Sequence, residues 1–156
     1  MADEQNQYVK VIVFQIKDEE YTIPVHTVGS IERMMPITRV PGTKSFVKGV
    51  LNLRGVVTPV IDLRERLGIH DAEITDQTRM ITVTIEGMNV GLIVDSANDV
   101  LDLDETWIEP PPEVVGEIEA DYIQGVVKLE NRLFILLNLE KILSKEDVLE
   151  LKHVHV

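Results

Sequence analysis

FVKGVLNLRGVVTPVIDLR, residues 46–64, contains two runs of aliphatic and β-branched residues joined at Arg54-Gly55. Runs of this kind on either side of a glycine-containing turn are typical of a β-hairpin. Pro59 lies inside the second run, and because proline has no amide hydrogen, we expect this strand to be a sheet edge or to be bulged there. Residues 62–67 then fit one or two helical turns, which Gly68 ends.

The same pattern occurs a second time in the chain. Residues 46–50 align with residues 122–126 at an offset of 76 (122 − 46), so that Gly49 falls on Gly125. Residues 11–31 align without a gap with residues 80–100 at an offset of 69 (80 − 11). Hydrophobic strands also align by chance, but the matching glycines and turns favour an internal duplication.

A duplicated unit of short strands predicts a mainly β protein. We expect a single domain over residues 1–156 with two subdomains, at about residues 9–68 and 78–143, and segments that cross between them are compatible with this division. Small sheets lose their exposed edges by closing into barrels. A barrel of ~65 residues is marginally stable alone, so the two should share an interface, where a groove can form.

Two segments favour helices instead. In residues 27–34, Val28 and Ile31 have the i, i+3 spacing of one helical face, which predicts a short helix. A C-terminal helix is expected over residues 144–151, with Ser144 as its N-cap and a frayed tail behind it.

The composition excludes several functional classes. The net charge of −12 disfavours binding to nucleic acid. The chain also lacks a basic amphipathic segment that would bind an anionic membrane surface. The chain has no cysteine, so disulfides and thiol catalysis are excluded. Residues 1–7 lack the features of a signal peptide, and no apolar stretch is long enough to span a bilayer. We expect a cytoplasmic protein without membrane insertion.

No motif indicates catalysis, a metal site or a cofactor. His153 and His155 have H-x-H spacing, but two solvated histidines in a mobile tail explain it better than a metal site. Neither a phosphate-binding glycine loop nor a nucleophile elbow is present. The triple proline at residues 110–112 fits a stiff connector better than a ligand for a proline-recognising module.

Residues 46–64 closely resemble the signature of the CheW family of chemotaxis proteins. So do residues 14–16, 20–21, 38–41, 90–95 and 122–125, and the resemblance covers about residues 9–143 in order. It implies two five-stranded SH3-like barrels packed together, in agreement with the repeat. The same domain occurs in CheA and CheV, but no kinase or receiver segment is attached here, so the free-standing coupling protein is the nearest form.

The resemblance implies a non-enzymatic adaptor with two partners. One surface would dock the regulatory domain of the histidine kinase CheA, and a groove would take the helical hairpin tip of a methyl-accepting chemoreceptor. The protein would be recruited from the cytoplasm to receptor arrays at the membrane, where CheW and CheA domains alternate in rings.

For the receptor contact, helix-in-groove recognition needs apolar anchors and a polar clamp. Val28 and Ile31 are the candidate anchors, and Arg54, with Asn52 beside it, is the candidate clamp. Many relatives carry a carboxylate just before the isoleucine, where this chain has Ser30, and on a helix Glu32 would point elsewhere. Val28 and Ile31 are equally compatible with plain core, and Arg54 and Asn52 with bracing of their own turn.

For the kinase contact, the resemblance implies Gly49 and Val57 in the first subdomain and Val114 in the second. Gly49 is also compatible with a purely backbone requirement, because Gly125 repeats it. The alternative function is a small-ligand or hydrolytic module that uses the groove between the barrels, which requires convergent polar groups in a closed pocket. Only Arg54 and scattered acidic residues support that alternative.

Overall fold

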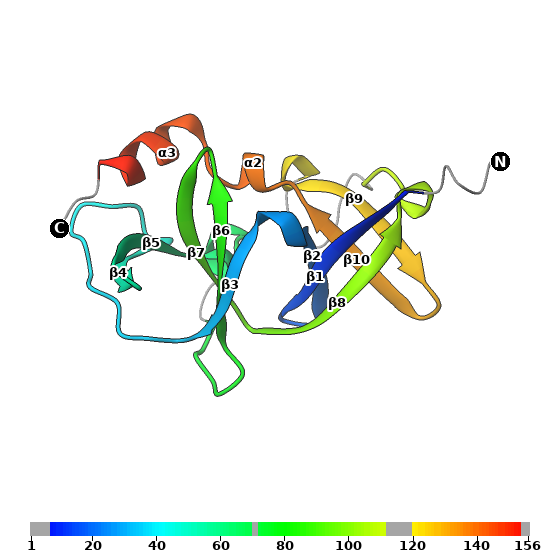
Figure 1. The fold of residues 1–156 in the computed structure, drawn as a ribbon, viewed down its shortest axis with the longest axis horizontal. Coiled ribbons are helices and arrows are strands. Elements are labelled where there is room, and N and C mark those ends of the chain that lie inside the picture. Colours follow the sequence, from blue (N-terminus) through cyan, green and yellow to red (C-terminus); the bar gives the residue numbers. More distant parts are fainter. Residues whose placement is uncertain (1–6, 70–71, 112–119, 154–156) are drawn as a thin grey trace.

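The computed structural model describes residues 7–69, 72–111 and 120–153. In this part the chain forms ten strands and short helices (Figure 1). The strands are β1 Tyr8–Ile16, β2 Glu19–Pro24, β3 Val28–Arg33, β4 Val47–Leu53, β5 Val56–Asp62, β6 Arg79–Ile85, β7 Met88–Val94, β8 Ser96–Asp104, β9 Ile123–Leu129 and β10 Arg132–Leu137. The helices are α1 Leu63–Arg66, α2 Leu139–Ile142 and α3 Lys145–Lys152, with 3-10 turns η2 Val25–Thr27, η3 Glu105–Trp107 and η4 Ala120–Tyr122.

The strands form two five-stranded sheets of the same topology. Sheet A has the order β8-β1-β2-β10-β9, and sheet B has the order β3-β6-β7-β5-β4. The repeat maps β1–β5 onto β6–β10, so each sheet combines the first two strands of one repeat with the last three of the other. The mainly β class with two five-stranded units is therefore confirmed, whereas closure of each sheet into a barrel stays a prediction.

The sheets do not follow the expected boundaries at residues 9–68 and 78–143. The chain crosses over after β2 and again after β7, because β3 pairs with β6 and β8 pairs with β1. The parallel pairs β10–β2 and β5–β7 complete the exchange. The crossing segments thus carry three strands of each repeat into the other sheet, and neither half of the chain forms a sheet by itself.

The strands bury side chains on both faces, and these side chains form three hydrophobic clusters. The largest contains residues of both sheets, such as Phe14 and Tyr21 of sheet A and Leu92 of sheet B. Two smaller clusters lie on the other faces, around Val11 and Phe134 in sheet A and around Leu51, Val60, Met80 and Ile93 in sheet B. Adjacent residues such as Val11 and Ile12 belong to different clusters, as the alternation along a strand requires.

The predicted helix over residues 27–34 is wrong. η2 ends at Thr27, and β3 follows it, paired antiparallel with β6. Tertiary pairing therefore overrides the i, i+3 spacing, and the β-branched residues Val28 and Ile31 suit a strand. Val28 packs against the large cluster, whereas the side chain of Ile31 is exposed.

The prediction that Pro59 marks a sheet edge or a bulge is also wrong. β5 lies between β4 and β7, and the bulge falls between Val47 and Gly49. Proline is tolerated because its partner Val50 directs both backbone groups to Thr38, so this pair exchanges no hydrogen bonds within the hairpin. Pairing with β7 begins only at Val60, so the amide that Pro59 lacks has no ladder partner to lose.

The helical turns predicted at residues 62–67 and the helix predicted at residues 144–151 are confirmed. Asp62 caps α1 by accepting a hydrogen bond from the Arg64 amide at 3.0 Å, and Gly68 follows with φ of 90°. Ser144 caps α3 in a capping box with Asp147. His70, His155 and Val114 lie outside the described residues.

Candidate protein-docking surface

The β4–β5 hairpin presents two apolar side chains to solvent, and because they are consecutive residues of β5 they point to opposite faces of the sheet. Val56 is 48% exposed and Val57 is 46% exposed, although the rest of β5 is buried. They are the first two residues after the hairpin turn, and burial begins at Thr58. Asn52 is the cross-strand partner of Val57, so a predicted receptor contact and a predicted kinase contact are direct neighbours.

The turn of this hairpin is held by its own side chains. Arg54 and Gly55 both have positive φ, 52° and 86°. Asn52 Oδ1 accepts a hydrogen bond from the Gly55 amide at 2.7 Å. Asn52 therefore braces the turn, and this turn directs the Arg54 side chain outward.

Arg54 links the hairpin to the opposite edge of sheet B. Its Nη2 donates to Glu32 Oε2 at 2.8 Å, although the Arg54 side chain is 67% exposed. Because Glu32 belongs to β3 and Arg54 follows β4, the pair bridges the two edge strands of the sheet. The hydrogen bond from Arg54, and after it one from Ser30, lowers the pKa of Glu32. This pair keeps a carboxylate and a guanidinium together on the surface.

The strand geometry changes the interpretation of Ser30. Residues two apart on a strand share a face, so Glu32 points the same way as Ser30, contrary to the expectation for a helix. The Ser30 amide and hydroxyl bind Thr82 Oγ1 at 2.7 Å and 2.9 Å. Glu32 thus supplies a carboxylate on the same face of β3 as Ser30.

Val100 is a surface residue that sequence reasoning missed. Ile31 is 41% exposed on β3, and Val100, its equivalent in the repeat, is 51% exposed on β8. β3 and β8 are the strands that follow the two crossovers between the sheets, and we call them the crossing strands (Figure 1). The alignment of the repeat already pairs Val100 with Ile31. The predicted helix at residues 27–34 gave no reason to consider Val100, because no helix is expected around it.

Gly49 has a backbone role. A Cβ at this position would lie 2.0 Å from the Thr38 carbonyl oxygen, and its φ is 142°. The segment around Thr38 approaches so closely because Thr38 and Val50 form a two-hydrogen-bond bridge. Glu109 and Val126 form the same bridge in the repeat, where a Cβ on Gly125 would lie 2.8 Å from the Glu109 oxygen. Gly49 therefore lets a connector pack against β4.

Comparison with known proteins decides the family. The CheW-like domain family matches residues 10–147, and the chemotaxis protein CheW of Bacillus subtilis (strain 168) is 48% identical over 137 residues, 88% of each chain. The chain belongs to the CheW family. The crystal structure of scaffolding protein TtCheW from Thermoanaerobacter tengcongensis matches it with a TM-score of 0.82 and 35% identity, covering 88% of this chain and 94% of that one. Protein FrzA of Myxococcus xanthus is 30% identical over 84% of this chain and 82% of its own.

Membership in the CheW family makes the chain a chemotaxis adaptor of the scaffolding type. Among the described residues, no cluster of three or more histidine, aspartate or glutamate side chains is arranged to hold a metal ion. In the same ranges, no helix has the length and apolarity needed to cross a bilayer.

Proposed function

We propose that this CheW-family chain couples chemoreceptors to the histidine kinase CheA, as a cytoplasmic protein recruited to receptor arrays. The observation that carries the proposal is the exposed Val57, which lies opposite Asn52 on the hairpin whose turn carries the Arg54–Glu32 ion pair. Apolar side chains in the centre of a patch with a polar rim are the usual anatomy of a protein interface.

The kinase contact centres on Val57, which docks the regulatory domain of CheA. Gly49 contributes by fixing β4 against the connector at Thr38, and not through a side chain. Val114 remains the proposed contact of the second kinase-facing region.

The receptor contact is formed by the two crossing strands β3 and β8. Ile31 and Val100 are apolar anchors for the helical hairpin tip of a chemoreceptor, and Arg54 with Glu32 is the polar clamp. Ser30 positions Glu32, and Val28 supports β3 from the core side.

Three arginine substitutions test this division of the surface. Val57→Arg abolishes binding to the CheA regulatory domain and keeps receptor binding, while Ile31→Arg does the opposite. Ile74→Arg, at an exposed isoleucine outside both surfaces, leaves both affinities on the order of micromolar. Binding is measured by titration calorimetry with soluble receptor tips and the isolated regulatory domain of CheA. Equal loss of both partners in Val57→Arg and Ile31→Arg, with melting temperatures unchanged, contradicts two separate docking surfaces.

A further inference from the structure

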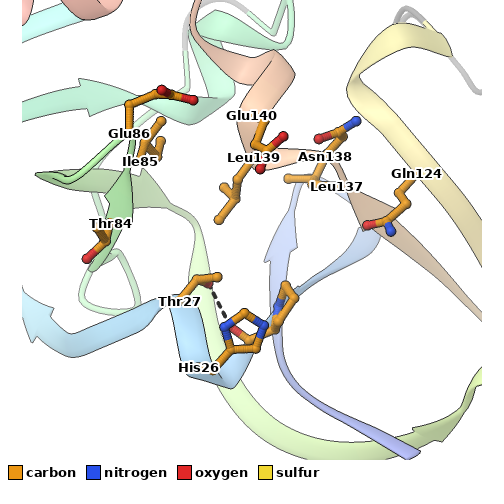
Figure 2. Close-up of a pocket in the computed structure, with 11 residues that line it drawn as sticks. His26, Thr27, Thr84, Ile85, Glu86, Gln124, Leu137, Asn138, Leu139 and Glu140 are labelled. Atoms are coloured by element: carbon orange, nitrogen blue, oxygen red, sulfur yellow. Dashed lines mark hydrogen bonds between the residues drawn. The ribbon is translucent and has the colours of Figure 1, made fainter. Parts of the chain in front are cut away.

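A polar pocket lies at the boundary of the two sheets, away from the docking surface. Its volume is about 410 Å³, and it is lined by the end of β2 with η2, the β6–β7 turn, β9 and the β10–α2 junction. Figure 2 shows His26 across the pocket from Glu86 and Glu140, with Asn138 next to Glu140 and Gln124 on the side away from Glu86. No lysine or arginine belongs to the lining.

The internal repeat gives this pocket a counterpart in the other half of the molecule. The offset of 69 maps Asp95 onto His26 (95 − 26) and Glu86 onto Lys17 (86 − 17). The offset of 76 maps Asn138 onto Asp62 (138 − 62) and Glu140 onto Arg64 (140 − 64). The two sites are therefore built from equivalent positions of the same fold.

The counterpart is filled by a buried guanidinium. Arg64 is 2% exposed, and its Nε and Nη2 donate to the two oxygens of Asp62 at 2.9 Å and 3.0 Å. Its Nη1 donates to Asp95 Oδ1 and to the Glu73 carbonyl, both at 2.9 Å. Asp95 in turn accepts from the Lys17 amide at 2.7 Å. This frame of strand ends and hairpin turn thus encloses one guanidinium between two carboxylates.

In the open pocket the guanidinium is absent, and Asn138 and His26 stand at the positions of the two carboxylates, Asp62 and Asp95, that hold it in the counterpart. Glu140 replaces Arg64, and Asn138, at the N-cap of α2, makes no side-chain capping hydrogen bond, unlike Asp62. Within the described part of the chain, neither Glu86 nor Glu140 forms an ion pair or a side-chain hydrogen bond. Glu86 and Glu140 therefore place two unpaired carboxylates where the counterpart has Lys17 and Arg64.

We propose that this pocket binds the guanidinium group of an arginine side chain carried by a partner protein. A guanidinium presents a planar fork of donors that matches carboxylate and amide oxygens. Arg64 shows that this fold can enclose a guanidinium at the equivalent place in the other half of the molecule, where two carboxylates hold it. No lining residue belongs to the proposed receptor or kinase contacts, so the inference stands independently of them.

The test uses N-acetyl-arginine amide as a mimic of a side chain in a protein, and N-acetyl-citrulline amide as its uncharged isostere. The side-chain amide signals of Gln124 and Asn138 are followed by NMR in the full chain. The blocked arginine shifts them saturably, with a dissociation constant on the order of a millimolar, and the blocked citrulline does not. Equal binding of both compounds, or no saturable shift with either, overturns the proposal.

Variants identify the groups responsible. Glu140→Gln weakens binding about tenfold or more, while Glu73→Gln, at an exposed glutamate outside the pocket, leaves it unchanged. Asn138→Asp restores the carboxylate of the counterpart and tightens binding, an effect that misfolding cannot imitate. Unaltered binding in both Glu140→Gln and Asn138→Asp contradicts the assignment. Much tighter binding of free L-arginine than of the blocked compound would indicate a receptor for the free amino acid and would overturn the partner side chain as ligand.

Discussion

Gly49→Ala separates a backbone requirement from a kinase contact at this position. The new Cβ would lie 2.0 Å from the Thr38 carbonyl oxygen, so the connector must move away from β4. A left-handed φ costs an alanine about 1–3 kcal/mol. The two hydrogen bonds between Thr38 and Val50, both 2.8 Å long, add about 1 kcal/mol each when they break. We therefore expect a loss of about 3–5 kcal/mol in the free energy of unfolding.

The assay is urea unfolding followed by far-UV circular dichroism, with thermal melting alongside it. For a chain of this length the loss corresponds to a melting temperature lower by about 10 °C or more. Gly68→Ala is the matched control, because Gly68 also has a positive φ, 90°, but no atom lies within 4 Å of a Cβ there. It should cost about 1 kcal/mol. Native stability of Gly49→Ala together with lost kinase binding would refute the backbone reasoning.

Three other substitutions probe the ion pairs. Arg64→Met leaves the carboxylates of Asp62 and Asp95 without their cation and should cost about 3–5 kcal/mol in urea unfolding; a cost below about 1 kcal/mol would contradict a structural role. Burial raises the pKa of Asp147, but hydrogen bonds from Lys44 and Ser144 outweigh it, and the pKa lies below its ordinary value. The stability that Asp147 contributes is therefore present above the unfolded-state pKa and lost as the pH falls through the folded-state pKa, so Asp147→Asn should be less stable than the parent at pH 7 and the gap should close in acid. A gap of equal size at both ends of an acid titration would be inconsistent with this. Arg54→Glu breaks an exposed pair with Glu32 and should change the unfolding free energy by about 1 kcal/mol at most while weakening receptor binding; a large fall in melting temperature would make Arg54 structural.

The hairpin and the C-terminal helix were predictable because their signals are local, and the repeat was predictable because two stretches of the sequence align with each other. Arg54-Gly55 marks the turn, Gly49 and Gly125 mark the same close approach twice, and Ser144 begins a helix through its capping box. The hairpin turn and the helix cap each depend on residues near one another in the chain. Pattern reasoning therefore reaches them.

The errors arose where distant strands decide the structure. Val28 and Ile31 have helical spacing, but pairing with β6, about fifty residues later in the chain, makes them part of a strand. The exchange of strands between sheets likewise depends on long-range pairing, so the sequence boundaries of the repeat did not become boundaries of the sheets. Pro59 is tolerated inside the sheet because no neighbouring strand accepts a hydrogen bond at its position. Only knowledge of the strand pairing could show this.

The candidate site was predicted in its residues more than in its arrangement. Arg54, Asn52 and Val57 were identified from the hairpin signature, but their adjacency on one surface follows from the β4–β5 register. The pairing of Arg54 with Glu32 required β3 and β4 to be the two edges of one sheet. The open pocket at Glu140 has no signature in local sequence, because its meaning comes from comparison with Arg64 in the repeat.

The most direct test of the coupling function is a titration of this chain with the regulatory domain of CheA from the same organism, followed by backbone amide chemical shifts. The account predicts saturable binding with the largest shifts at Val56, Val57 and their neighbours on β4. Absence of binding at high concentration, or saturable binding whose shifts leave the β4–β5 hairpin unaffected, would contradict it.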